Sequence, residues 1–193
     1  PATVKADINP RTVTVTVTLS GNDLQTDADG AYYEYDGTEK KPDVTVTADD
    51  NNAVLAPSDY TVSYANNKNA GNATVTVTNA EGGNYTFTSQ SVTFEIKSTA
   101  AKLTSTPQAK RLTYNGTDQD LVTVGTATGG TVVYSLSPIN PKDPKTYSEN
   151  IPQKTDAGTY TVYYMVKGDG NHSDSDEGQV TVTIAPKTVK DPT

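Results

Sequence analysis

Acid-rich loops are the first parts of this sequence that could do chemistry, because calcium takes six to eight oxygen ligands. Asp27-Ala28-Asp29-Gly30 has part of a calcium-loop pattern, but Gln25 stands where the first Asp ligand would be. Asp and Asn also favour turns through local hydrogen bonds. We therefore interpret these loops as solvated turns and predict no metal site, with calcium binding as the open alternative. The other clusters are Asp49-Asp50-Asn51-Asn52 and the group Asp169, Asn171, Asp174, Asp176 and Glu177.

His172 is the one histidine of the chain, and it lies beside Ser173 and Ser175 in an acidic loop. A catalytic triad needs its nucleophile, base and orienting acid to converge in a pocket from a rigid frame. A single Gly-flanked loop is a poor way to build that geometry. The absence of Cys also excludes a cysteine nucleophile, a thiolate zinc site and a disulfide framework. The sequence therefore predicts a protein that is not an enzyme, with no catalytic residues and no cofactor.

Tyrosines could form a platform on which sugar rings stack. Strand alternation places Tyr33 and Tyr35 on one face and Tyr32 on the other, so at least one of them should lie in a core. Trp is the usual main platform for sugars, and the chain has none. We interpret the tyrosines as half-buried strand residues. The second tyrosine cluster consists of Tyr160, Tyr163 and Tyr164.

The overall charge and hydropathy exclude two classes of partner. Lys and Arg number 15 and Asp and Glu number 23, which gives a net charge of −8 among 193 residues. A negative surplus disfavours nucleic acid and anionic membrane surfaces. The sequence has no run of about 18 apolar residues, so we predict that no segment of this fragment inserts into a membrane.

The elements that must position these residues are predicted to be strands. The chain contains 33 Thr and 20 Val, residue types that fit a pleated, half-buried surface. Val13, Val15 and Val17 alternate with threonines, and no window of a dozen residues has a helical period. The candidate strands are Thr12–Leu19, Tyr32–Tyr35, Val44–Val46, Tyr60–Tyr64, Thr74–Thr78, Val92–Ile96, Leu112–Tyr114, Leu121–Val124, Thr131–Leu136, Tyr160–Val166 and Gln179–Ile184.

An internal repeat organises these strands. Three alternating segments end at Ile8, Ile96 and Ile184, a step of 88 residues each time. Tyr35-Asp36-Gly37-Thr38 matches Tyr114-Asn115-Gly116-Thr117, displaced by 79 residues.

A second landmark has a different displacement. Asn69-Ala70-Gly71 matches Asp156-Ala157-Gly158 with a displacement of 87 residues. The second copy should therefore hold about eight extra residues between the two landmarks, and the Pro-rich stretch 137–144 is the predicted insertion, since proline suits surface loops.

These spacings predict two full modules, at residues 9–96 and 97–184. Residues 1–8 would be the last strand of a preceding repeat or an extra strand of the first module, and residues 185–193 the start of a following repeat or a linker. Because the chain opens with Pro1 and its single Met is Met165, we expect it to be a piece of a longer polypeptide.

One motif specifies the kind of sandwich. Asp156-Ala157-Gly158-Thr159-Tyr160-Thr161-Val162 has the layout of an immunoglobulin tyrosine corner, in which a Tyr begins a strand two residues before the inter-sheet Cys. Val162, and Val75 in the other copy, would replace the disulfide by an apolar contact. Ala73 stands at the Tyr position of the first module. We predict an all-β chain of two tandem immunoglobulin-like β-sandwich modules.

The whole set of landmarks resembles tandem bacterial immunoglobulin-like repeats of cell-surface and secreted proteins, including the related Tyr-Asp-Gly repeats of haemagglutinin-like adhesins. The resemblance extends to Asp59-Tyr60-Thr61-Val62-Ser63-Tyr64 and Gly83-Asn84-Tyr85. Some related repeats are assigned a β-grasp fold, which needs a helix that we do not find, so β-grasp-like modules rank second. Such surface modules can also carry a Lys–Asn isopeptide crosslink, but no suitable trio can be named here.

The resemblance implies a non-catalytic structural or adhesive region, acting as a stalk, spacer or adhesion module at a bacterial cell surface or in a secreted protein. The expected location is extracellular. The expected partners are a host or neighbouring-cell surface protein or glycan, and neighbouring repeats of the same chain. The alternative is a carbohydrate-binding module appended to a secreted glycan-active enzyme.

Overall fold

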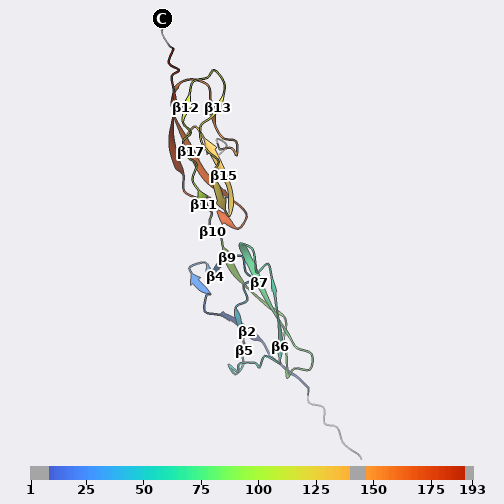
Figure 1. Ribbon diagram of the computed structural model, residues 1–193. Helices are drawn as coiled ribbons and strands as arrows, with labels where there is room; N and C mark the ends of the chain where they lie inside the picture. Colours follow the sequence, from blue (N-terminus) through green and yellow to red (C-terminus); the bar gives the residue numbers. More distant parts are fainter. Residues whose placement is uncertain (1–8, 140–146, 190–193) are drawn as a thin grey trace, which may run out of the picture. The chain divides into compact units, whose positions relative to one another are not determined.

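The computed structural model describes residues 9–139 and 147–189 and divides the chain into two compact units between Ser98 and Thr99 (Figure 1). Within these ranges every regular element is a strand, so the fold class is all-β as predicted, and neither the helix of a β-grasp fold nor one fit to cross a membrane is found there. The predictions for residues 1–8 and for most of the Pro-rich stretch lie outside the described residues.

The first unit is built around a five-stranded sheet in the order β3-β4-β9-β7-β6. The pair β2-β5 faces it, and the short strands β1 and β8 pair in parallel. The strands are β1 (Arg11–Thr12), β2 (Val15–Ser20), β3 (Gln25–Asp27), β4 (Gly30–Glu34), β5 (Asp43–Ala48), β6 (Tyr60–Ala65), β7 (Gly71–Asn79), β8 (Tyr85–Thr86) and β9 (Gln90–Lys97).

The core of the first unit follows from the alternation of Val and Thr. On β7, Ala73, Val75 and Val77 are fully buried on one face while the threonines between them are half-buried. Val46 of β5 packs from the opposite layer into the same core. Full burial of one such aliphatic side chain is worth roughly 1.5–3 kcal/mol. The period of two in the sequence therefore fixes which face of each strand lies inside.

The second unit has a four-stranded sheet in the order β12-β19-β17-β15. Short pairs complete it: β11 with β14, β13 with β16, and β10 with β18. The strands are β10 (Thr99–Ala100), β11 (Lys102–Ser105), β12 (Leu112–Thr113), β13 (Gln119–Asp120), β14 (Thr126–Thr128), β15 (Gly130–Ser135), β16 (Gln153–Lys154), β17 (Gly158–Gly168), β18 (His172–Ser173) and β19 (Gly178–Ala185).

The second unit has the internal marks of an immunoglobulin-like sandwich. The Tyr160 hydroxyl donates to the backbone oxygen of Asp156 at 2.9 Å, which confirms the tyrosine corner. Val162 is fully buried and packs with Leu121 and Val122 from the other layer. The aliphatic contact predicted in place of an inter-sheet disulfide is therefore present.

Equivalent strand pairs occur in the two units. In the first unit β4 runs parallel to β9 with Tyr33 opposite Ile96, and in the second β12 runs parallel to β19 with Leu112 opposite Ile184. Tyr33 and Leu112 are 79 residues apart in the sequence, and Ile96 and Ile184 are 88 residues apart, which are the displacements found in the sequence analysis. The two units thus repeat the register of their strands.

The length difference between the units is not the single insertion that the sequence predicted. In the first unit residues 49–59 join β5 to β6, whereas Gly129 alone joins β14 to β15. Between β15 and β17 the second unit has residues 136–157, which include β16 and the stretch predicted as the insertion, where the first unit has only residues 66–70. The second unit is therefore longer at the β15–β17 connection and shorter at the β14–β15 connection, and the two changes together give the net difference in length.

The predicted strand Leu121–Val124 is also only partly a strand. β13 ends at Asp120, and the residues after it change neighbours: the Leu121 N–H donates to the Pro152 oxygen, and the Thr123 N–H to the Gln108 oxygen. A segment that pairs with short stretches on both sides cannot form one continuous ladder. Apolar alternation alone could not predict this change.

The tyrosine corner generates a first prediction. We expect Tyr160→Phe to lower the free energy of unfolding of the second unit by about 1 kcal/mol, the net value of one intramolecular hydrogen bond. Amide hydrogen exchange of the whole chain should then speed up roughly fivefold in the second unit. The first unit, with Ala73 at the equivalent position, should not change.

Tyr163→Phe is the matched control, because no hydrogen bond of its hydroxyl is found among the described residues. An equal effect of both substitutions would mean that the corner bond is not the cause.

Candidate functional site

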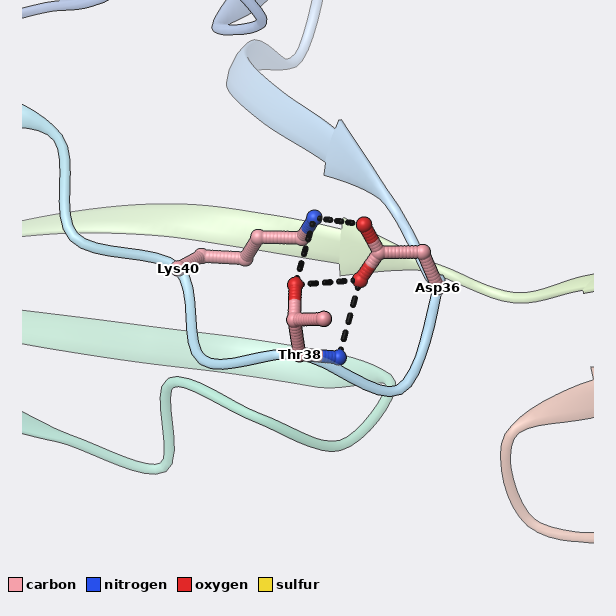
Figure 2. Close-up of polar contacts among 3 residues, drawn as sticks. All are labelled: Asp36, Thr38 and Lys40. Carbon is pink, nitrogen blue, oxygen red and sulfur yellow. Dashed lines mark hydrogen bonds and ion pairs between the residues drawn. The ribbon is translucent and has the colours of Figure 1, made fainter.

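The Tyr-Asx-Gly-Thr motif forms a compact polar cluster in the first unit (Figure 2). The Asp36 Oδ1 accepts the backbone N–H of Thr38 at 2.9 Å and the Thr38 hydroxyl at 2.7 Å. Gly37 between them has a φ of 82°, a left-handed conformation that a side chain would strain. The motif is therefore an Asx turn, a local structure in which each residue type has a specific role.

Lys40 completes this cluster. Its Nζ lies 2.7 Å from the Asp36 Oδ2 and 3.4 Å from the Thr38 Oγ1, as Figure 2 shows. Its stem is mostly buried and its ammonium lies 5.5 Å from the centre of the Tyr33 ring. The hydrogen bond from Lys40, followed by those from Thr38, holds the pKa of Asp36 far below its usual range.

The second unit repeats the turn without the charges. The Asn115 Oδ1 accepts the Thr117 N–H and hydroxyl, both at 2.9 Å, and Gly116 has a φ of 79°. Gln119 stands at the position that corresponds to Lys40, and its amide donates to the Thr113 oxygen instead. The turn is thus common to both units, while the ion pair is replaced at both of its positions by a neutral pair.

This arrangement does not suit catalysis. A general base works best with a pKa near the working pH, and the lowered pKa of Asp36 makes its carboxylate a weak base. The Thr38 hydroxyl donates to that same carboxylate, so its proton has no stronger acceptor at hand. The cluster instead fixes the chain just after Tyr35, whose backbone N–H donates to the Lys97 oxygen at 2.8 Å.

The acidic cluster at Asp27 forms the turn of the β3–β4 hairpin. The Asp27 Oδ1 accepts the Asp29 N–H at 2.9 Å, and its Oδ2 forms an ion pair with Lys97. The hydrogen bond from Lys97 and then that from the Asp29 backbone lower the pKa of Asp27. Its oxygens are bonded to protein donors, as expected for a solvated turn. No group of carboxylates and imidazoles able to hold a metal is found in the described part of the chain.

The other two acidic clusters are used in the same way. Asp174 bonds the Lys167 ammonium and the Gly168 N–H, both at 2.9 Å. The Asp49 carboxylate accepts the Thr16 hydroxyl at 2.7 Å, and Asp50 pairs with Arg11. Each of these carboxylates ties a loop to a neighbouring strand.

The contacts of His172 hold a loop and a turn in place. Its Nδ1 lies 2.8 Å from the Asp169 Oδ1, and its ring packs so closely over Gly129 that a Cβ there would come within 2.6 Å. The Ser175 hydroxyl accepts the Val166 N–H and donates to the Asp176 oxygen. The hydroxyl of Ser175 is therefore bonded to backbone on both its donor and its acceptor side.

The tyrosines divide as the alternation predicted. Tyr33 is buried against Phe94 with an edge-to-face contact of 5.5 Å between ring centres. Tyr32 faces outward, where the Lys97 ammonium covers its ring at 3.8 Å and its hydroxyl donates to Gln25. Tyr164 packs over Gly178. Tyr33 is therefore a core residue, and one face of the Tyr32 ring is covered by Lys97.

One buried acid was not singled out as a site from the sequence. Asp59 is 2% exposed and accepts both the Asn84 backbone N–H at 2.8 Å and its side-chain amide at 2.9 Å. An isopeptide crosslink would need a lysine beside such a carboxylate. Among the described residues both hydrogen-bond partners of its side chain belong to Asn84, so Asp59 joins the β5–β6 connection to the loop before β8.

The Asp36–Lys40 pair predicts a pH dependence. A carboxyl whose pKa is lowered by folding stabilises the folded state above its unfolded pKa, near 3.8, and this stabilisation is lost as the pH falls through the lower folded value. We expect Asp36→Asn to flatten the acid-side loss of stability of the first unit below about pH 4. Urea unfolding at a series of pH values, followed by NMR signals of that unit, measures this.

The double variant Asp36→Asn with Lys40→Gln installs the pair of the second unit and is the matched control. It should keep the turn and show the same flattened profile. A profile as steep as that of the unmodified chain would contradict the assignment to Asp36.

No family model matches the chain, and no curated protein matches it. Among solved structures it is similar to the fibronectin(III)-like modules of Clostridium thermocellum CbhA, with 10% sequence identity, a TM-score of 0.30, and coverage of 89% of this chain and 95% of that chain. A likeness at this level carries no argument about function. The immunoglobulin-like assignment rests on the strand pairing, the layered core and the tyrosine corner.

Proposed function

We propose that the chain is a non-catalytic, load-bearing pair of tandem immunoglobulin-like repeats, a stalk or spacer of a bacterial cell-surface or secreted protein, related to the Tyr-Asp-Gly repeats of adhesins. Its place of action would be extracellular. The single observation that carries the proposal is a pair of parallel contacts in each unit: the first strand pairs with the next-to-last strand, and the closing strand pairs with an early strand.

Parallel pairing is the geometry that resists tension along the chain. If the two ends of a unit are pulled apart, parallel neighbours near those ends slide in opposite directions, and their hydrogen bonds are loaded together in shear. In the first unit this applies to β1 with β8 and to β4 with β9. In the second unit it applies to β10 with β18 and to β12 with β19.

The connection between the units supports the same role. β9 ends at Lys97 and β10 begins at Thr99, so Ser98 alone lies between the strands. One residue spans about 3.3–3.6 Å at most, which is too short to act as a flexible tether. Tension would pass from the closing strand of one unit directly into the opening strand of the next.

Neighbouring repeats are the partners that this proposal names first. Lys187-Thr188-Val189 matches Arg11-Thr12-Val13, and Val13 is buried in the first core whereas Val189 is 90% exposed. A following repeat would bury Val189 in the same way. The net charge of −8 would keep such an array soluble. Contact of an exposed face with a host or neighbouring-cell surface protein or glycan would add the adhesive role.

The load-bearing role predicts a result in single-molecule force spectroscopy. The unmodified chain, pulled through its two ends, should give two unfolding events of similar force. Tyr114→Pro removes the N–H that donates to the Ala185 oxygen at 2.8 Å, and should lower the force of one event while leaving the other unchanged.

Tyr114→Ala keeps this N–H and removes the exposed ring, so it should leave both forces near those of the unmodified chain. Forces that do not respond to Tyr114→Pro, or that fall equally for both variants, would count against the parallel pair as the load-bearing element and against the stalk function.

A further inference from the structure

The second unit has a hollow of about 700 Å³ on one flank, within the size range of small-molecule sites. Its lining combines apolar side chains with polar and acidic ones. The lining residues are Asp120, Val124, Gly125, Thr131, Val132, Tyr134, Glu149, Asn150, Ile151 and Gln153.

The first unit covers the corresponding position with its own chain. There the Leu55 N–H donates to the Val46 oxygen and the Ala48 N–H to the Ala53 oxygen, both at 2.9 Å, so residues 53–55 lie along β5. Leu55 is buried in the core. The second unit goes from β14 through Gly129 directly into β15 and lacks this covering segment. The hollow is therefore a specific difference between two units that otherwise share their register.

The rim of the hollow carries a fixed set of hydrogen-bonding groups. The Gln153 amide donates to the Asp120 Oδ1 at 2.8 Å, and Lys110 lies 3.1 Å from the other oxygen. These two bonds lower the pKa of Asp120, so its carboxylate stays ionised and accepts hydrogen bonds. Glu149 and Asn150 are exposed on the same rim. Carboxylates and amides together offer both acceptors and donors to a ligand rich in hydroxyl groups.

Tyr134 provides a donor at the base of the hollow. It is 3% exposed, and its hydroxyl oxygen accepts the Gly125 N–H at 2.8 Å. No acceptor for its own proton is found among the described residues, so that proton can be donated to a bound ligand. Val124 also lines the hollow; it is 67% exposed and offers an aliphatic surface to the C–H face of a ring.

We propose that this hollow binds a neutral saccharide, of the size of one or two hexose rings, with Asp120, Glu149, Asn150, Gln153 and the Tyr134 hydroxyl as its hydrogen-bonding partners. The activity is independent of the stalk function. An acidic sugar is disfavoured by the two carboxylates of the rim and by the net charge. A divalent cation is disfavoured because the Lys110 ammonium already lies against the Asp120 carboxylate, and because no group of carboxylates and imidazoles able to hold a metal is found among the described residues.

The test is an NMR titration of the whole chain with glucose, galactose, mannose and N-acetylglucosamine, each up to about 100 mM, a range that detects millimolar binding. At least one sugar should give saturable shifts of the amides of Val124, Gly125, Ile151 and Gln153. Signals of the first unit should not move. Absence of saturable shifts with all four sugars overturns the proposal, as do shifts spread equally over both units.

Variants connect the shifts to the hollow. Glu149→Ala and Asn150→Ala change exposed side chains and should each weaken binding about fivefold, and Tyr134→Phe should do the same if it folds. Glu81→Ala, an exposed acid of the first unit, is the control and should leave binding unchanged. Equal binding by all variants would place the sugar elsewhere, and shifts produced by calcium chloride but by no sugar would make the hollow a cation site; both overturn the proposal.

Discussion

Parallel pairing between a short early strand and the closing strand is the interaction on which each unit depends. The Tyr35 N–H to Lys97 oxygen bond and the Tyr114 N–H to Ala185 oxygen bond are both 2.8 Å long and end the pairing at the same position of the repeat. Two parallel strands must be connected by a long segment of chain, so this pairing brings together residues that are separated by most of the length of a unit. The strands between can then pack around a core whose two ends are already joined.

The Asx-Gly-Thr turn keeps this closing contact in register. A turn placed one residue earlier or later would reverse which side of β4 or β12 faces the core, because successive strand residues point to opposite faces. Tyr33 is buried in the first unit, and Leu112, at the same place in the second, packs partly buried against its core. The side-chain oxygen of Asp36 or Asn115 and the positive φ of Gly37 or Gly116 fix the position at which the chain leaves the sheet.

Much of this architecture could be predicted from the sequence because it depends on periodic and local signals. Alternation located the long strands, and the spacing of Ile96 and Ile184 predicted equivalent closing strands. Two-residue strands such as β8 and β18 carry no periodic signal. The hollow and the buried Asp59 arise from contacts between distant segments, which spacing along the chain does not specify. The difference in length between the two units has a related explanation. The displacement of the sequence landmarks gives only a net number of residues, and this number combines a shorter β14–β15 connection with a longer β15–β17 connection.

The differences between the two units show which features the fold requires and which it leaves free. The closing pair, the turn and the buried aliphatic at Val75 or Val162 are present in both, and each contributes to the core or to its closure. The ion pair of Asp36 with Lys40 is replaced in the second unit by Asn115 with Gln119, and the turn is retained without it. The flank beside β5 or β14 also differs: it is a covered edge in the first unit and an open hollow in the second. The proposed stalk function would require only the first set, so a flank that the fold does not constrain is where such a repeat could acquire a binding site without loss of that proposed function.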